Sequence, residues 1–336
     1  MKAVVQSRYG NPVEVLQVRD IPPPTIGPGE VLVRVRAASV HPDVWHVVTG
    51  LPYVLRFMGA GLSRPKQRVP GTDLSGVVEA VGRDVSRLQP GEAVFGESHA
   101  GFQWVNGGAF AEYAAVPQDV LVRKPDNVTF EQAAAVPSSG VIALTNLQQA
   151  APIQPGQRVL INGAGGGVGS IAIQIAKSRG AHVTGVDRAD KLEMVYGLGA
   201  DAVIDYTRQD CTRGGKTFDL IFDVASNLAP ADCKRMLAPA GTYVFIGHDH
   251  YGNAAGRVLG SLPRAVAHVV RTAIAQRSRA SLPVPGKQEL MTTLAELLRS
   301  GRLTPVIDRA FTLDRVHEAM EYLQTGRARG KIVLTA

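Results

Sequence analysis

The chain has few cysteines: Cys211 and Cys233 are the only two among its 336 residues. Two thiols are too few for a disulfide framework or for a zinc site with four cysteine ligands. The chain also lacks an apolar run long enough to cross a bilayer, and its first residues show neither a secretory apolar core nor an arginine-rich transit segment. We therefore expect a cytoplasmic protein.

Dense runs of Lys and Arg are absent as well, although the formal net charge is +7 and the sequence pI is near 9.5. Basic residues that are scattered in this way do not form the concentrated patch that nucleic acid requires. We therefore expect no nucleic-acid partner.

One stretch, residues 257–279, does concentrate positive charge. It contains five arginines and no acidic residue, and Arg257, Arg264 and Arg271 recur at every seventh position. This is the pattern of a basic amphipathic helix. It favours a lid beside the substrate or a subunit interface, and peripheral docking on an anionic membrane surface is the alternative.

The length allows two domains, and the hydrophobic pattern changes near residue 125. Before that point Val31, Val33 and Val35 recur at every second position, and short strand patterns follow at 74–81, 91–95 and 109–116. Such a series is typical of an antiparallel β domain.

From residue 158, strand-like runs alternate with helical segments, which predicts a parallel, doubly wound sheet. The runs are Arg158–Asn162, His182–Asp187, Ala202–Asp205, Asp219–Val224 and Thr242–Ile246. Before them, Thr129 and Gln132 resemble a helix capping box. After them come a helix pattern at 313–323 and a terminal strand at 331–335, which we expect to return to the first domain.

The strongest motif is a glycine-rich turn between an apolar strand and a helix. Ala164, Gly166 and Gly169 occupy the three small positions of the dinucleotide fingerprint. The first is expected to make the turn, the second to let backbone approach the pyrophosphate, and the third to let the helix pack on the strand. The N–H groups and the dipole at the helix N-terminus would bind the phosphates.

An acidic residue lies where the fingerprint needs one. Asp187 ends the next strand, eighteen residues after Gly169, close to the spacing of about 20 expected for an acid that binds the ribose. A carboxylate there favours NADH, because it accepts hydrogen bonds from the ribose diol and repels a 2′-phosphate. Arg188 and Lys191 lie just beyond and leave NADPH open, so the expected cofactor is NAD(P)H.

These residues make the chain resemble the medium-chain dehydrogenase/reductase superfamily, in its quinone-oxidoreductase-like branch. The resemblance is carried by residues 162–169, 199–206, 70–78 and 330–333 and covers essentially the whole chain. It implies an α/β protein with a GroES-like β-barrel domain at 1–124 and 310–336 and a Rossmann domain at 125–309. It also implies a homodimer.

The resemblance implies cofactor contacts at several positions of the family's motifs. Thr145 would lie near the nicotinamide, and Tyr206 and Lys191 near the adenosine. Motif and resemblance together give this set of expected cofactor-binding residues: Thr145, Ala164, Gly165, Gly166, Gly167, Val168, Gly169, Asp187, Arg188, Lys191, Tyr206, Ala225, Ile246, Gly247 and Lys331.

Zinc-dependent members of the superfamily carry three converging metal ligands. The resemblance places His41, Thr72-Asp73 and Ser138 at those positions. One histidine without thiolates is a poor zinc site, so we expect no metal. The alternative is a metal held by His41, His46 and Asp73.

Without zinc, a conjugated enone, enal or quinone is an easier hydride acceptor than an isolated ketone, because the developing charge spreads over an enolate or quinol. We therefore expect an NAD(P)H-dependent quinone or enone oxidoreductase. The resemblance implies Tyr53 as the candidate proton donor, because it falls where some enoyl-reductase relatives carry a proton-donating tyrosine. His46 and His41 are the alternatives; otherwise Tyr53 only lines an apolar pocket. An alcohol dehydrogenase and a non-catalytic, membrane-associated dinucleotide-binding protein are the other functional hypotheses.

Overall fold

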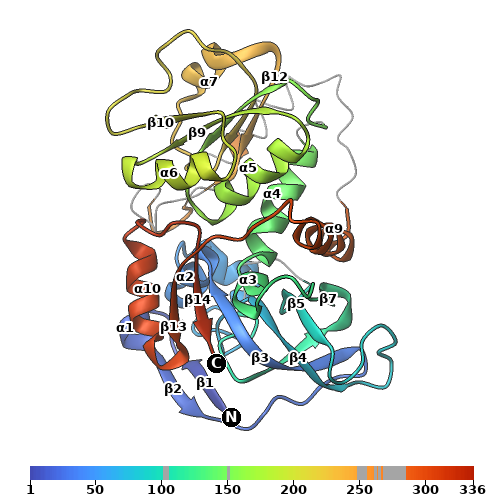
Figure 1. Ribbon diagram of the computed structural model, residues 1–336. Helices are drawn as coiled ribbons and strands as arrows, with labels where there is room; N and C mark the ends of the chain where they lie inside the picture. The colour runs from blue at the N-terminus through green and yellow to red at the C-terminus, as the bar shows by residue number, and fades with distance from the viewer. Residues whose placement is uncertain (101–105, 150–151, 248–255, 261–262, 264–265, 268–284) are drawn as a thin grey trace. The chain divides into compact units, whose positions relative to one another are not determined.

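A computed structural model describes residues 1–100, 106–149, 152–247, 256–260, 263, 266–267 and 285–336 (Figure 1). These residues form two compact units: Met1–Val141 with Gly286–Ala336, and Ile142–Pro285. Both chain ends therefore belong to the first unit. No helix in these described stretches has the length and apolarity needed to cross a membrane.

The first unit is built on a seven-stranded, mostly antiparallel sheet. Its strands are β3 (Glu30–Val40), β4 (Asp73–Val81), β5 (Ala93–Glu97), β6 (Tyr113–Pro117), β7 (Leu121–Arg123), β13 (Ile307–Thr312) and β14 (Lys331–Thr335). The strand order is β13-β14-β3-β4-β5-β7, and β6 also pairs with β3. A separate antiparallel pair is formed by β1 (Lys2–Gln6) and β2 (Leu16–Asp20).

The terminal strand β14 pairs antiparallel with β3 (Figure 1). In this pairing Ile332 lies opposite Val40. The prediction that the chain returns to its first domain is confirmed. The alternation in β3 is confirmed as well, because Val31, Val33 and Val35 are buried in the core of the first unit.

Short helices connect these strands. They are α1 (Pro12–Val15), α2 (Pro42–Thr49), the π-helical turn η1 (Arg56–Ala60), the 3-10 turns η2 (Gln118–Val120) and η3 (Leu313–Arg315), α3 (Phe130–Ala134), α9 (Lys287–Arg299) and α10 (Val316–Gln324). Helix α4 (Pro137–Gln149) begins in the first unit and continues into the second. The predicted capping box is present at α3, where Thr129 and Gln132 bind each other's backbone N–H groups.

The second unit is built on a five-stranded parallel sheet, as predicted. Its strands are β8 (Arg158–Asn162), β9 (His182–Asp187), β10 (Ala202–Asp205), β11 (Phe218–Asp223) and β12 (Leu237–Phe245), and its helices are α5 (Gly167–Ser178), α6 (Ala189–Gly197) and α7 (Pro230–Met236). The order β10-β9-β8-β11-β12 reverses direction next to β8. Ligands of such open sheets bind at the carboxyl ends of the strands beside this switch point.

Three strands of the parallel sheet have the bounds that the local sequence predicts. The predicted bounds of β8, β9 and β10 agree with the structure, whereas β11 and β12 begin earlier and end one residue earlier than predicted. Val159, Leu160 and Ile161 in β8 are fully buried. A strand that is buried on both faces has a continuous run of apolar residues in its sequence, which makes it easy to recognise.

The predicted domain boundaries fall inside the first unit, which runs to Val141 and resumes at Gly286. Residues 125–141 and 286–309 thus group with the β unit. The assignment of a dinucleotide-binding domain to residues 125–309 stays a prediction. Most of the predicted basic helix at 257–279, including Arg264, Arg271, Arg277 and Arg279, lies outside the described residues.

Candidate functional site

The loop between β8 and α5 turns sharply at a glycine. Gly163 has a φ of 81°, and the N–H groups of Gly163 and Ala164 both donate to the carbonyl of Val186, at 3.0 and 3.1 Å. Ala164 lies within this turn, as predicted. The left-handed residue is Gly163, because glycine adopts a positive φ at no steric cost, and Ala164 is fully buried behind it.

The two later glycines of the motif have different surroundings. A Cβ on Gly166 would meet only the carbonyl oxygen of Gly163, at an ordinary contact distance of 3.6 Å. A Cβ on Gly169 would lie 2.1 Å from the same oxygen and 2.8 Å from Cα of Ala164. Gly169 thus allows α5 to pack tightly on the loop, while the backbone at Gly166 stays open.

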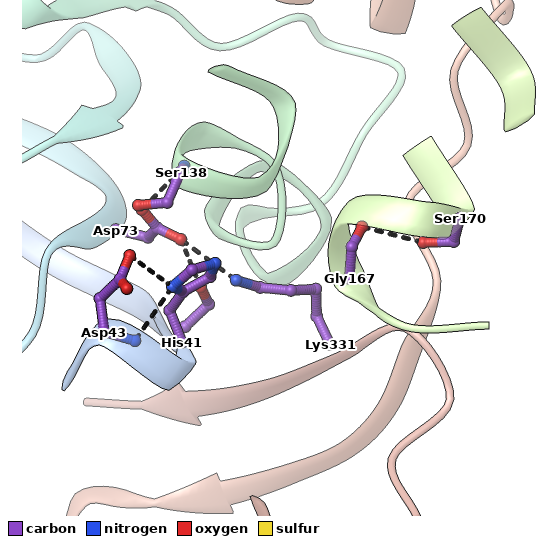
Figure 2. A network of polar contacts seen from close by, with 8 residues as sticks. His41, Asp43, Asp73, Ser138, Gly167, Ser170 and Lys331 are labelled. Carbon is purple, nitrogen blue, oxygen red and sulfur yellow. Dashed lines mark hydrogen bonds and ion pairs between the residues drawn. The ribbon is translucent and has the colours of Figure 1, made fainter. Parts of the chain in front are cut away.

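This open backbone begins helix α5, with Gly166 as its N-cap. The first N–H groups of a helix lack intrahelical acceptors and carry its positive dipole end. The one polar side chain in the first turn, Ser170, donates to the carbonyl of Gly167 at 3.1 Å (Figure 2), and no side chain caps the first N–H groups of the helix. The donor set and the open glycine backbone fit the pyrophosphate of a dinucleotide.

The carboxylate of Asp187 joins the end of β9 to the glycine loop. Its Oδ2 accepts the N–H of Gly165 at 2.7 Å, and its Oδ1 accepts the N–H of Arg188 at 2.8 Å. Lys191 Nζ lies 4.0 Å from Oδ1, and both side chains are buried. A Cβ on Gly165 would lie 2.8 Å from the Lys191 side chain, which makes this contact specific for glycine.

The other residues expected near the adenosine surround Asp187. Tyr206 is about half exposed, and its backbone N–H donates to the backbone carbonyl of Asp187 at 3.2 Å. Burial, followed by the negative charge of Asp187, raises the pKa of the Tyr206 phenol. Arg188 Nε pairs with Asp190 at 3.2 Å. Arg188, Lys191 and Tyr206 thus all lie next to Asp187 at the end of β9. Thr145, the residue expected near the nicotinamide, is half-buried in α4.

The remaining expected contacts of the second unit lie in two loops beside the glycine loop. The N–H of Ala225 donates to the carbonyl of Asn162 at 3.2 Å. The N–H of Gly247 donates to Ser226 Oγ at 2.8 Å, and that of Ile246 to the carbonyl of Asp223 at 3.2 Å. The three loops therefore meet at the carboxyl edge of the sheet.

The three predicted proton donors occupy unlike environments in the first unit. His41 caps α2, and its Nδ1 lies 3.0 Å from the carboxylate of Asp43. His46 is bonded through Nδ1 to the carbonyl of Leu51 at 2.8 Å. Both histidines are buried, whereas Tyr53 is 41% exposed. Of the three, Tyr53 is the most exposed residue.

A buried network lies behind His41 (Figure 2). Asp73 is fully buried, and its Oδ2 accepts a hydrogen bond from Ser39 Oγ at 2.7 Å. Its Oδ1 accepts the N–H of Ser138 at 3.0 Å and the Ser138 hydroxyl as well. Lys331 Nζ donates to Oδ2 at 3.3 Å and is itself 5% exposed. The structure thus pairs Lys331, an expected cofactor contact, with Asp73.

A second ion pair, of which only the carboxylate is fully buried, lies next to the first and was missed by sequence reasoning. Glu97 stands directly opposite Asp73 in the β4–β5 ladder and is fully buried. Lys287 forms an ion pair with Glu97 and donates to the carbonyl of His99 at 3.0 Å. Two lysines of the C-terminal segment therefore neutralise two carboxylates of the N-terminal sheet.

Comparison with known proteins places this geometry in a family. A model described as an alcohol dehydrogenase GroES-like domain matches residues 27–126, and one described as a zinc-binding dehydrogenase matches residues 198–334. A chloroplastic quinone-oxidoreductase from Triphysaria versicolor is 31% identical over 343 residues, which cover 99% of this chain and 98% of the relative. The chain belongs to the medium-chain dehydrogenase/reductase superfamily.

Two other relatives agree with this assignment. The chloroplastic NADPH-dependent alkenal/one oxidoreductase of Arabidopsis thaliana is 30% identical over 354 residues, covering 99% of this chain and 79% of the relative. The solved quinone oxidoreductase from Coxiella burnetii superposes with a TM-score of 0.82 at 28% identity, covering 100% and 99% of the two chains. This member of the superfamily is thus an oxidoreductase with a GroES-like and a Rossmann-like sheet.

The name of one matching family model implies zinc, but the side chains at the three ligand positions do not suit that metal. Of the three, His41 has Nδ1 engaged with Asp43, Asp73 is neutralised by Lys331, and Ser138 offers only a hydroxyl. Zinc in proteins is held by thiolate, imidazole and carboxylate groups that are free to coordinate it. Within the described residues, no cluster of three His, Cys, Asp or Glu side chains could hold a metal.

Proposed function

We propose that this protein is a reductase that uses NAD(P)H to reduce quinones or α,β-unsaturated carbonyl compounds without zinc. The observation that carries the proposal is the ion pair between Lys331 and Asp73. Asp73 stands where zinc-dependent members place a metal ligand, and its negative charge is already balanced by the Lys331 ammonium. The open backbone at Gly166 and the N-terminus of α5 support dinucleotide binding. Relatives named for quinones and for alkenals and alkenones support the substrate class.

The bound cofactor would supply hydride, and the protein would have to stabilise and protonate the resulting enolate or hydroquinone anion. A carbonyl only accepts hydrogen bonds, so His46 Nδ1 carries its hydrogen toward Leu51, and Nε2 could donate a proton only from the doubly protonated imidazolium. We propose the Tyr53 hydroxyl as the proton donor and the His46 imidazolium as the second candidate. The Arg56 guanidinium lies 4.8 Å from the centre of the Tyr53 ring and would hold the ring in place.

The decisive experiment measures consumption of NADH and NADPH in the presence of a quinone, an enal, an enone and a saturated ketone. We expect turnover with the conjugated acceptors, none with the saturated ketone, and no loss after treatment with a chelator. Tyr53→Phe should lower kcat by about 100-fold if its hydroxyl is the general acid. Turnover confined to the saturated ketone, or abolished by the chelator, would reject the proposal.

Cofactor binding can be tested at the glycine loop itself. Gly166→Val should leave the unit folded and raise the dissociation constant for NAD(P)H about tenfold or more, because the new side chain would project into the open space above the loop. Gly197→Val is the matched control, since a Cβ at Gly197 in α6 meets nothing within 4 Å. Equal affinities of the two variants in a fluorescence titration would show that no pyrophosphate lies at Gly166.

A further inference from the structure

The parallel sheet contains a buried carboxylate that the proposed reaction does not use. Asp223 ends β11 and is fully buried at the carboxyl edge of the sheet. Its partners come from three different segments, and each segment leads into or belongs to a loop with expected cofactor contacts. We propose that Asp223 is a positioning residue that holds these loops in the arrangement that receives a dinucleotide; the inference rests on the proposed function.

Four donors satisfy the carboxylate of Asp223. Oδ1 accepts the side-chain amide of Asn162 at 2.7 Å and the N–H of Ser226 at 2.8 Å. Oδ2 accepts the hydroxyl of Tyr243 at 2.8 Å and the N–H of Leu228 at 3.3 Å. Two donors on each oxygen match the lone pairs that an ionised carboxylate offers.

The donors connect three loops through one side chain. Asn162 is the last residue of β8 and immediately precedes the turn at Gly163. Ser226 and Leu228 belong to the loop that contains Ala225. Ser226 Oγ in turn accepts the N–H of Gly247, which joins the third loop to the same network. The glycine loop, the 224–228 loop and the 246–247 segment therefore share one anchor.

The backbone of the 224–228 loop shows that this arrangement is imposed. Ser226 has a φ of 56° and is the one residue other than glycine with a positive φ in the described part of the chain. A side chain in the left-handed region costs about 1 kcal/mol or more and persists only where surrounding contacts hold it. Here those contacts are two hydrogen bonds: the Ser226 N–H donates to the Asp223 carboxylate, and the Ser226 hydroxyl oxygen accepts the N–H of Gly247.

The chemistry of the four donors makes the carboxylate difficult to replace. Asparagine has the same shape as aspartate, but its amide has one accepting oxygen and one donating nitrogen. Two of the four donors around Asp223 would then face an NH₂ group that also donates. Asp223→Asn should therefore release part of the network, although it adds no atom and leaves no cavity.

The sheet provides a matched control in the same strand. Asp219 lies at the opposite, amino end of β11, and its Oδ2 accepts the N–H of Arg158 at 2.8 Å. Asp219→Asn makes the same substitution far from the three loops. We expect Asp223→Asn to raise the dissociation constant for NAD(P)H at least about tenfold, equal to about 1.4 kcal/mol, and Asp219→Asn to change it less than twofold.

Hydrogen exchange provides the readout that a general loss of stability would not reproduce. In Asp223→Asn, peptides that span 162–169, 224–228 and 245–247 should exchange faster, while peptides from β9 and α6 should keep their protection. Ser226→Ala, which removes the acceptor for Gly247 but leaves the carboxylate, should weaken binding by a smaller factor and loosen only the 245–247 peptide. This variant keeps the test decisive if Asp223→Asn fails to fold.

The outcomes separate this inference from the proposed function. If the wild-type protein binds neither NADH nor NADPH, the proposed function fails and the inference fails with it. If the wild type binds and the folded Asp223→Asn and Ser226→Ala variants bind equally well, the inference is wrong and the proposed function stands. Faster exchange spread evenly over the whole second unit would assign Asp223 a structural role alone.

Discussion

Asp73 and Asp223 are both fully buried, yet the chain satisfies them in different ways. Asp73 is the first residue of β4 and has the Lys331 ammonium as a partner. Asp223 is the last residue of β11, and no Lys, Arg or His in the described parts of the chain forms an ion pair with it. It relies on backbone N–H groups, an amide and a phenol.

The difference follows from where each aspartate stands in its strand. A turn that follows a strand can fold back and direct its N–H groups at the last side chain, as Ser226 and Leu228 do toward Asp223. The residues that precede a strand rarely do so, and Asp73 instead receives an ammonium from the other end of the chain. One carboxylate is thus stabilised by local dipoles and the other by a distant charge.

The largest expected effect comes from removing that distant charge. Lys331→Met should destabilise the protein by roughly 3–5 kcal/mol, because it leaves the Asp73 carboxylate buried without a cation. The measurement is the free energy of unfolding in urea. The double variant Asp73→Asn/Lys331→Met should recover most of the loss, since a neutral amide needs no counter-charge. If Lys331→Met alone were as stable as the wild type, the hydrogen bonds from Ser39 and Ser138 would be enough to stabilise the Asp73 carboxylate, as neutral donors are for Asp223.

The second effect is a loss of stability in alkali that comes from the neighbours of Asp223. Burial, followed by the negative charge of Asp223, raises the pKa of the Cys233 thiol to about 12 and raises the pKa of the Tyr243 phenol as well. The unfolded chain releases the thiol proton near pH 9, while the folded chain keeps it. Stability should therefore fall by up to about 1.4 kcal/mol per pH unit between pH 9 and 12 for this group alone.

Cys233→Ala isolates the contribution of the thiol. The variant should lose less stability than the wild type when both are unfolded in urea at pH 8 and at pH 10.5, although it is somewhat less stable at the lower pH because a buried side chain has been shortened. Identical slopes for the two proteins would show that the thiol ionises as readily in the folded as in the unfolded state.

The comparison also shows what local sequence can and cannot predict. The place of the glycine-rich turn between β8 and α5 and the bounds of strands β8 to β10 were predicted correctly, because their signals lie within a few neighbouring residues. The pairing of Asp73 with Lys331 spans 258 residues and has no local signature. The same holds for Glu97 and Lys287, whose charges look like ordinary surface residues in the sequence.

The Asp223 network had a signal that could have revealed it. Asn162 and Asp223 each end an apolar strand run, and polar residues at the carboxyl ends of parallel strands meet at one edge of the sheet. The role of Ser226 could not be found in this way, because its positive φ is imposed by the fold. The same holds within the glycine-rich turn: the fingerprint marks Ala164 as a small residue, but only the backbone geometry shows that Gly163 has the positive φ.

The smallest predicted effect compares the two aspartates most directly. Ser39→Ala and Tyr243→Phe each delete one hydroxyl that donates to Oδ2 of a fully buried aspartate, at 2.7 and 2.8 Å. Tyr243→Phe should cost about 1 kcal/mol more than Ser39→Ala, because a hydrogen bond to a charged group is stronger where no cation shares the charge. Urea unfolding of both variants at pH 7 measures the difference. A larger loss for Ser39→Ala would mean that the Lys331 ammonium contributes little to holding the Asp73 carboxylate, and that the hydroxyls do most of the work at both sites.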